Sequence, residues 1–224
     1  MSLSVEQLTN ASGSSMKLSA KVIPQVLDYN GILTTSPTQE FFSFALQDPT
    51  LVEPFIESFV RATIAEGHPV VARLPEFGIV GVGLFFGPGQ ASLVTEHQKD
   101  QGFNQLMQRV NEDTRKWFTE YFIKEMLHKL VEPAFGPGVQ HDNYHLQIFG
   151  VSPNHQGKDI GKAILQQVEA KAKSEGVDVV LETLAPENVV RYGKMGYEVQ
   201  GTAHFNHPSF SEPRKITCLR KRLH

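Results

Sequence analysis

Apolar residues recur every three or four positions along several stretches of the chain, which is the spacing of one face of an α-helix. The clearest stretch, residues 52–66, stops at Gly67 before Pro69 and predicts a helix with that end. Residues 103–130 predict one long helix or a broken pair, ended by the proline- and glycine-bearing residues 133–138.

Shorter apolar runs, either continuous or alternating with polar residues, predict strands. Two further helices are predicted, one over residues 16–29 and one that contains residues 163–172 and ends at Gly176. Residues 30–50 mix the two periods and predict irregular chain with one short helix. The predicted strands are residues 3–8, 70–73, 79–86, 144–151, 177–181, 197–199 with 204–206, and 215–219. We therefore expect an α/β (α+β) fold with a mixed sheet of about seven strands flanked by helices.

Length and composition favour one compact folding unit that binds a small molecule. A chain of 224 residues with 40% hydrophobic content can bury about 70% of its unfolded surface. Its net charge of -3 gives no general attraction to nucleic acid or anionic lipid, and its most apolar stretch still carries Glu57 and Arg61. The single cysteine, Cys218, and the absence of a signal-like apolar run in the first thirty residues are typical of a reducing compartment. We expect a cytoplasmic monomer or homodimer.

A short glycine-bearing loop joins the predicted strand at 144–151 to the helix that follows. Such a loop directs free backbone N–H groups and the positive end of the helix dipole at one place, which suits a pyrophosphate. Lys158 and Lys162 add positive charge there. Glycine in a strand-to-helix turn can equally serve only to allow positive φ, so the loop alone leaves both interpretations open.

Residues 151–163 resemble motif A of the GNAT acetyltransferases, whose loop reads Gln/Arg-x-x-Gly-x-Gly/Ala, through Gln156-x-x-Asp159-x-Gly161. A second segment is similar to the family's Asn-x-x-x-Tyr-x-Lys-x-Gly-Phe/Tyr pattern. It comprises Leu181-Glu182-Thr183, Pro186, Asn188 and Arg191-Tyr192-Gly193-Lys194-Met195-Gly196-Tyr197. The resemblance covers about residues 144–200, and this series resembles the puromycin acetyltransferase branch, whose members acetylate small-molecule amines.

The resemblance implies a single acetyltransferase domain, residues 1–224, with a GNAT fold whose sheet is splayed beside the cofactor strand. Residues 1–143 would supply N-terminal strands and acceptor-side helices, residues 144–200 the acetyl-CoA-binding core, and residues 201–224 the last strands. The implied reaction is direct transfer of an acetyl group from acetyl-CoA to the primary amine of a small molecule, such as a toxin, an antibiotic or a metabolite.

The resemblance also assigns roles to particular residues. Tyr192 stands at the family's general-acid position and would protonate the leaving thiolate of coenzyme A. Main-chain groups near Phe149 and Val151 would hydrogen-bond the pantetheine arm, and a backbone N–H of the same strand would polarise the thioester carbonyl. Asn188 would contact the cofactor. The other cofactor-binding residues are those of the loop, namely Gln156, Gly157, Lys158, Asp159, Ile160, Gly161 and Lys162.

One position of the loop departs from the family pattern, because Asp159 stands where the family has its first glycine. An aspartate disfavours positive φ and brings a negative charge toward a pyrophosphate. With a negative φ, its N–H could still donate while the carboxylate turned to solvent or paired with Lys158 or Lys162. We expect cofactor binding to survive.

The acceptor must lose a proton before it attacks, because an ammonium group has no lone pair. His145 and Glu182 are the candidate bases, and a water chain is the alternative. His145 shares the strand alternation of Gln147, Phe149 and Val151, and an imidazole titrates near neutral pH. Glu182 ends the following strand beside the splay, although each of the two is equally an ordinary strand-end polar residue. The histidine pairs His141 with His145 and His204 with His207 lack acidic or thiolate companions at metal-ligand spacing, so we expect no metal.

Two other functions fit the same sequence. Acetylation of protein lysines or N-termini would favour an open acidic groove over a closed aromatic pocket. A non-catalytic acetyl-CoA-binding module has its only sequence hint in Asp159. The aromatic residues at 117–122 have the helical spacing of core packing, and the chain before Tyr144 carries no motif that identifies the acceptor.

Overall fold

The structure is a computed structural model that describes residues 2–8, 42, 45–207 and 211–224. Its seven described strands form one mixed sheet in the order β1-β2-β3-β4-β5-β7-β6, which confirms the predicted fold class. Neighbouring strands are antiparallel except β4 and β5, which are parallel. The strands are β1 Ser4–Gln7, β2 His68–Leu74, β3 Gly78–Phe86, β4 Tyr144–Val151, β5 Val179–Thr183, β6 Glu198–Phe205 and β7 Arg214–Lys221.

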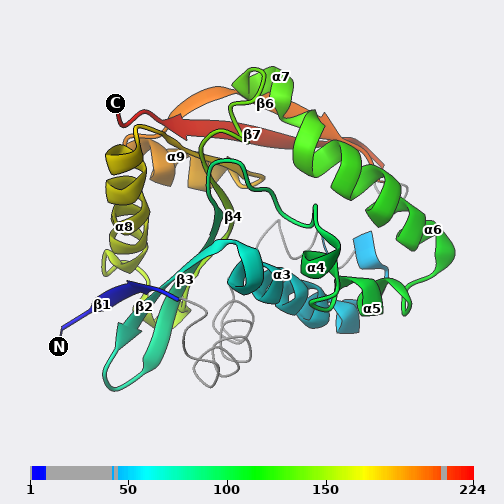
Figure 1. The fold of residues 1–224 in the computed structure, drawn as a ribbon, viewed down its shortest axis with the longest axis horizontal. Coiled ribbons are helices and arrows are strands. Elements are labelled where there is room, and N and C mark those ends of the chain that lie inside the picture. The colour runs from blue at the N-terminus through cyan, green and yellow to red at the C-terminus, as the bar shows by residue number, and fades with distance from the viewer. Residues whose placement is uncertain (1, 9–41, 43–44, 208–210) are drawn as a thin grey trace.

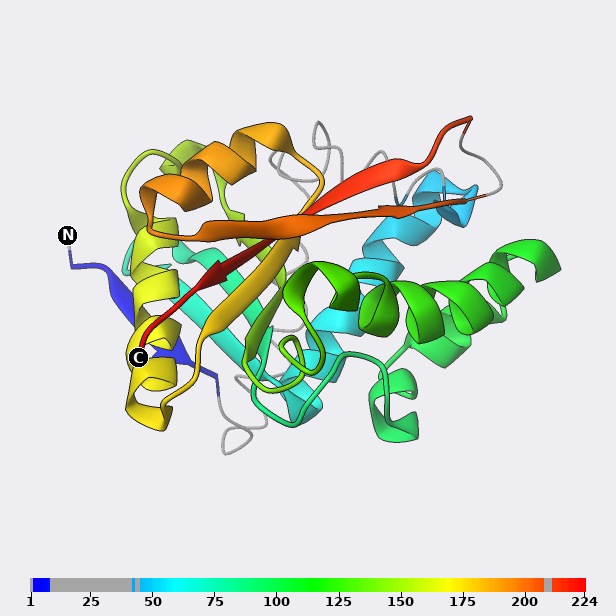
Figure 2. The same cartoon turned by 90° about the horizontal axis from the view of Figure 1, so that it is seen from above.

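Helices cover both faces of this sheet. α8 and α9 lie on one face, and α3, α5 and the π-helical η2 lie on the other (Figures 1 and 2). The buried residues accordingly form two clusters, one on each face. The described helices are η1 Pro49–Leu51, α3 Val52–Glu66, α4 Glu96–Lys99, α5 Phe103–Met107, α6 Glu112–Lys116, η2 Trp117–Leu130, α7 Glu132–Phe135, η3 Pro153–His155, α8 Ile160–Glu175 and α9 Pro186–Lys194.

An aromatic cluster holds α3 against the helices that follow it in the chain. Phe55 is fully buried, and its ring centroid lies 5.0 Å from that of Phe59 and 5.2 Å from that of Phe118. Phe122 and Trp117 join the same cluster. Aromatic rings at these separations add to the free energy of apolar burial, so the aromatic residues at 117–122 contribute to the core, as predicted.

The segment 103–130 is a broken pair of helices, with the break between α5 and α6. Asn111 begins α6 by accepting a hydrogen bond from the Thr114 N–H at 2.8 Å, and the chain then continues directly into η2. α7 lies where the sequence predicted only a break. Pro133 sits in its first turn, where the missing N–H of a proline is not needed.

Other predicted elements differ in smaller ways. β6 includes residues 200–203, which lay between the two apolar segments of the predicted strand, because it pairs with β7 along its length across a register shift between Val199 and Gly201. β5 begins two residues later than predicted. The predicted helix at 16–29 and most of the irregular stretch at 30–50 lie outside the described residues.

β4 parts from β5 in the middle of the sheet. The two strands pair only from Tyr144 with Val179 to Leu146 with Leu181, whereas β4 continues along β3 as far as Val151. The sheet is therefore splayed beside β4, as the sequence resemblance implied.

A β-bulge at this point corrects one prediction. Leu146 pairs with Phe85 and Ile148 with Leu84, so Gln147 is the extra residue of β4. The bulge reverses the alternation of side chains, and Leu146 and Phe149 both pack against the α8 cluster. The prediction that His145 shares a face with Phe149 was wrong. Neighbouring residues of a strand point to opposite faces, so His145 lies on the face opposite to that of Leu146 and Phe149.

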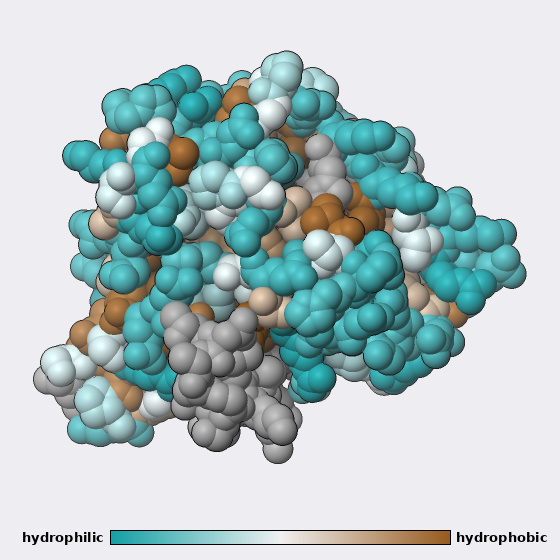
Figure 3. Space-filling model, in the orientation of Figure 1, coloured by the Kyte–Doolittle hydropathy of each residue, from teal (hydrophilic) through white to brown (hydrophobic). Residues whose placement is uncertain are grey.

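Polar side chains cover most of the face shown in Figure 3. Large exposed apolar side chains occur at separate positions of the described chain, among them Phe77 and Val190. Of the helices in the described ranges, none combines the length and the apolar character that crossing a bilayer requires.

We predict that Phe55→Ala lowers the free energy of unfolding by about 3–5 kcal/mol, because it empties the centre of the aromatic cluster. Urea denaturation measures this change. Phe77→Ala is the matched control, because Phe77 is 56% exposed and its loss should cost less than about 0.5 kcal/mol. Equal effects of the two substitutions would contradict the central place of Phe55 in the core.

Candidate active site

A cavity of about 730 Å³ lies where β4 parts from β5, bounded by the loop before α8 and by α9. Nine of the ten predicted cofactor-binding residues line it, which are Phe149, Val151, Gln156, Gly157, Asp159, Ile160, Gly161, Lys162 and Asn188. Lys158 is outside this lining, and its ammonium donates to the carbonyl oxygen of Asn154 at 3.0 Å. The loop therefore uses Lys158 to brace itself.

The first turn of α8 opens onto the cavity. The Ala163 N–H donates to the Asp159 carbonyl at 2.9 Å, and no side chain caps the helix at Asp159. The N–H groups of the turn that precede Ala163 consequently have no carbonyl partner within the helix and are available to an anion. Gln156 ties the loop to β4 by donating to the Val151 carbonyl at 3.1 Å. These features fit a pyrophosphate.

Gly161 has a packing role rather than a conformational one. A Cβ atom at this position would lie 3.1 Å from the ring of Phe149 and 3.5 Å from the side chain of Val151. Glycine therefore lets the start of α8 approach β4 closely enough to close one side of the cavity.

Asp159 does not have the negative φ that was considered as one condition for this loop. Its φ is 56° and its ψ is 10°, so the residue adopts the left-handed conformation rather than a negative φ. Aspartate tolerates this region better than most non-glycine residues do. Among the described residues, its carboxylate forms no ion pair with Lys158 or Lys162. Lys162, Arg191 and Lys194 bring positive charge to the same cavity.

Tyr192 is the buried residue of α9, and its ring faces the cavity. Its ring centroid lies 6.5 Å from that of Phe149 on β4 and 5.6 Å from that of Tyr197. Burial raises the pKa of the Tyr192 phenol above its ordinary range, so the hydroxyl keeps its proton at neutral pH. The neighbouring Tyr197 hydroxyl instead donates to Glu169 at 3.1 Å.

Asn188 connects α9 to the end of β5. Its side-chain nitrogen donates to the Thr183 hydroxyl at 3.4 Å, and its oxygen accepts from Arg191 at 3.0 Å. The predicted contact with a cofactor is compatible with this position, since Asn188 also lines the cavity.

The two candidate bases form a single hydrogen-bonded pair. Nε2 of His145 lies 2.7 Å from Oε2 of Glu182, although the residues are 37 positions apart. Both side chains are mostly buried, at 7% and 16% exposure. Neither lines the cavity itself, and the pair lies at the root of the splay, within a residue of the last paired position. An imidazole held by a carboxylate is a common arrangement for accepting a proton.

Sequence reasoning missed Gln140, which completes this cluster. Its side-chain nitrogen donates to Oε1 of Glu182 at 2.9 Å and lies 3.3 Å from Nε2 of His145. Gln140 belongs to a loop with no motif, so the sequence offered no signal for it. Cys218 pairs with Glu182 across β7 and β5, and burial, aided by Glu182, raises the pKa of its thiol to about 12.

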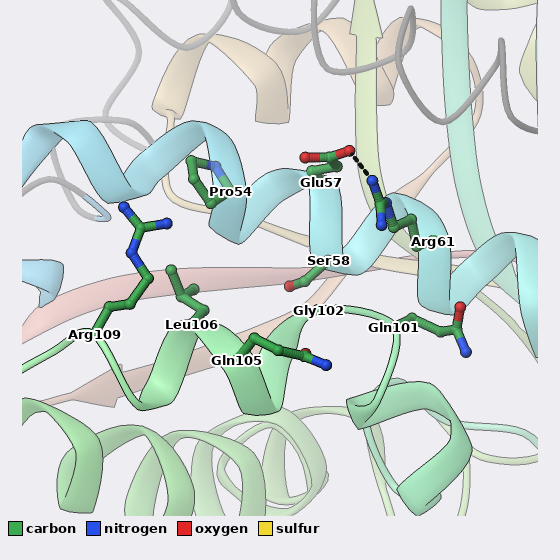
Figure 4. Close-up of a pocket in the computed structure, with 9 residues that line it drawn as sticks. All are labelled: Pro54, Glu57, Ser58, Arg61, Gln101, Gly102, Gln105, Leu106 and Arg109. Atoms are coloured by element: carbon green, nitrogen blue, oxygen red, sulfur yellow. Dashed lines mark hydrogen bonds and ion pairs between the residues drawn. The ribbon is translucent and has the colours of Figure 1, made fainter.

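A second cavity, of about 160 Å³, lies between α3 and α5 (Figure 4). Figure 4 shows the Arg61 guanidinium directed at the Glu57 carboxylate, with which it pairs. Arg109 and Gln105 complete its polar rim. This cavity is small and none of its lining comes from β4, so the larger cavity is the candidate active site.

Comparisons with known proteins agree with this geometry. Residues 117–199 match the family model described as an acetyltransferase (GNAT) domain. Arylalkylamine N-acetyltransferase 2 from Aedes aegypti has a similar structure, with 11% identity, a TM-score of 0.60 and full coverage of both chains. Mosquito arylalkylamine N-acetyltransferase like 5b gives 16% identity and a TM-score of 0.61, covering 98% of this chain and 99% of that one. Drosophila melanogaster polyamine N-acetyltransferase gives 15% identity and a TM-score of 0.59, and the match covers 99% of this chain and 100% of that one.

The fold and the family match define an acyltransferase of the N-acetyltransferase class. The family match identifies a GNAT acetyltransferase domain over residues 117–199, and the structural likeness extends the shared fold over the whole chain. At these identities the structural likeness concerns the fold, and the finer resemblance to the puromycin acetyltransferase branch stays a prediction.

We predict that Asp159→Ala is less stable than Asp159→Gly by about 1 kcal/mol. Both substitutions remove the carboxylate, but only glycine adopts a positive φ without a steric cost, so the difference isolates the backbone conformation. Chemical denaturation of the two variants measures it. Equal stabilities would mean that the loop does not hold residue 159 in the left-handed region.

Proposed function

We propose that the protein is an acetyl-CoA-dependent N-acetyltransferase that acts, as one domain over residues 1–224, on the primary amine of a small molecule. The cavity beside β4 carries this proposal. Its lining includes the first turn of α8, the edge of β4 that is no longer paired with β5, and Tyr192. Acetyl-CoA has a pyrophosphate, an amide-bearing arm and a thioester, and each finds a matching group there.

The edge of β4 suits the amide-bearing arm. Beyond Leu146 this edge no longer pairs with β5, and Phe149, Gly150 and Val151 line the cavity. An extended chain with amide groups can add to such an edge as a further strand would, through main-chain hydrogen bonds. The bulge at Gln147 turns the strand just before this segment.

The loop and the first turn of α8 suit the pyrophosphate. Gly157 and Gly161 allow the required turn and the close approach of α8 to β4, while Lys162 supplies a cation beside the free N–H groups. Arg191 and Lys194 extend the positive charge along α9. The carboxylate of Asp159 opposes these charges and weakens binding without abolishing it.

Acetyl-CoA supplies the acetyl group as a thioester, and its carbon–sulfur bond breaks as the bond to the amine nitrogen forms. Tyr192 donates its proton to the departing sulfur, and the proton that the nitrogen loses as the amide forms restores the phenol. Because burial raises the pKa of this phenol, Tyr192 remains protonated between turnovers at neutral pH. His145 accepts the proton that the ammonium form of the acceptor releases, directly or through a water, and Glu182 stabilises the resulting imidazolium.

A small amine is the acceptor that the available observations favour. Two of the similar structures are named for arylalkylamine acetylation, and a third is described as forming N-acetylagmatine. The Glu182 carboxylate, although mostly buried and bound by His145 and Gln140, places a negative charge at the root of the splay, which favours an ammonium group nearby. These points support the acceptor class and leave the individual amine to experiment.

A thiol-release assay with acetyl-CoA tests the proposal against arylalkylamines, polyamines and lysine peptides. Turnover with a small amine supports it, and turnover with peptides alone replaces it with protein acetylation. Binding of acetyl-CoA without turnover would indicate a non-catalytic module. Absence of binding would contradict the assignment of the cavity to acetyl-CoA.

We predict that Tyr192→Phe lowers kcat about 100-fold while the KM for acetyl-CoA changes less than about threefold, because only the proton donor is lost. Steady-state kinetics with the best amine measures both constants. Tyr197→Phe is the matched control, since its hydroxyl faces Glu169 and its loss should leave kcat within about twofold. Similar kcat values for the two variants would remove Tyr192 from the mechanism.

We also predict that Asp159→Asn binds coenzyme A about three- to tenfold more tightly than the native protein, because it removes a negative charge beside the anion. Isothermal titration calorimetry measures the change, which should shrink at high salt. Asp113→Asn, an exposed substitution on α6, is the control and should leave affinity unaltered. Unchanged or weaker binding by Asp159→Asn would mean that the carboxylate does not oppose the ligand.

A further inference from the structure

Gln140 lies in the loop between α7 and β4, and local hydrogen bonds hold that loop in place. The Gly89 N–H donates to the His141 carbonyl at 2.9 Å, which ties the loop to the end of β3. The Asp142 N–H donates to the Gly138 carbonyl at 2.9 Å, and the Asn143 side chain donates to the Val139 carbonyl at 2.7 Å. The backbone of Gln140 is therefore positioned independently of the side chains that it touches.

The amide of Gln140 and the imidazole of His145 occupy the two oxygens of Glu182. Gln140 reaches Oε1 at 2.9 Å, and His145 reaches Oε2 at 2.7 Å. An amide nitrogen only donates, so Oε1 is an acceptor and the carboxylate cannot rotate without losing this bond. Gln140 thus fixes the plane of the carboxylate.

The fixed carboxylate selects one tautomer of His145. A distance of 2.7 Å between Nε2 and Oε2 is that of a charge-assisted N–H···O bond, so the ring proton lies on Nε2. In the neutral imidazole the lone pair is then on Nδ1. Nδ1 is consequently the atom that accepts a proton.

We infer that Gln140 is a positioning residue that acts through Glu182 to hold His145 in the tautomer with its proton on Nε2. The inference rests on the proposed function for its catalytic consequence. Gln140 touches neither the large cavity nor its lining loop, so it affects proton transfer and not binding of the acetyl donor.

Gln140→Met is the test, because methionine has nearly the same length and cannot donate a hydrogen bond. We expect kcat with a small amine to fall about 10- to 100-fold, the usual effect of losing a group that orients a functional side chain, with the KM for acetyl-CoA unchanged. Gln90→Met is the matched control. Gln90 also braces a loop with two hydrogen bonds, to Gly87 and Glu66, but does not touch the pair.

A spectroscopic measurement separates positioning from general loosening of the fold. The ¹⁵N chemical shifts of the His145 ring should report the Nε2–H tautomer in the native protein and in Gln90→Met, and a mixture of tautomers in Gln140→Met. Native-like spectra and a native kcat in folded Gln140→Met would overturn the inference. Thermal unfolding checks that each variant is folded. If Gln140→Met does not fold, Gln140→Asn replaces it in the same measurements, because its shorter amide cannot reach Glu182 from the same backbone.

The kinetic and the spectroscopic measurements also keep this inference distinct from the proposed function. Lack of turnover by the native protein with any amine would overturn the proposed function, and the ¹⁵N spectra would still decide whether Gln140 sets the tautomer. If the native protein turns over a small amine and Gln140→Met keeps the full kcat, the proposed function is supported and Gln140 has no part in it.

Discussion

The separation of β4 from β5 after Leu146 is the constraint on which the site depends. A strand inside a sheet normally satisfies its backbone groups on both edges, and β4 does so along β3 as far as Val151. On its other edge the pairing stops halfway, in the middle of the protein. Backbone groups at such a place need another partner, and the cavity of about 730 Å³ beside Phe149 and Val151 gives a ligand access to them.

Several local features maintain this separation. The bulge at Gln147 bends β4 where the pairing with β5 ends, and the glycine at 161 lets α8 pack closely against the bent part. α9 occupies the other side of the gap, with Tyr192 directed at β4. Each feature is modest alone, but together they present a helix N-terminus, a strand edge and a phenol to the same space.

The sheet also divides the chemistry between its two faces. The face with α8 and α9 carries the cavity and Tyr192, whereas alternation along β4 puts His145 on the face of α3 and the aromatic cluster. The gap between the strands joins these faces, so groups on both sides can act on one reaction. A buried imidazole and carboxylate are costly unless each has partners, and Gln140 supplies the last one.

The sequence alone determined the elements whose signals are local. α3 has the predicted bounds because its apolar spacing and Gly67 lie within one short stretch, and the loop from Gln156 to Gly161 was recognisable because its residues are adjacent. Nine of the predicted cofactor-binding residues line one cavity for the same reason, although their roles remain predictions. Only the tertiary structure decided the face of His145, because a bulge depends on pairing with another strand, and it alone joined Glu182 to Gln140 and His145, which are 42 and 37 positions away. Periodicity describes neighbours along the chain, whereas these contacts arise from how the strands pair and part.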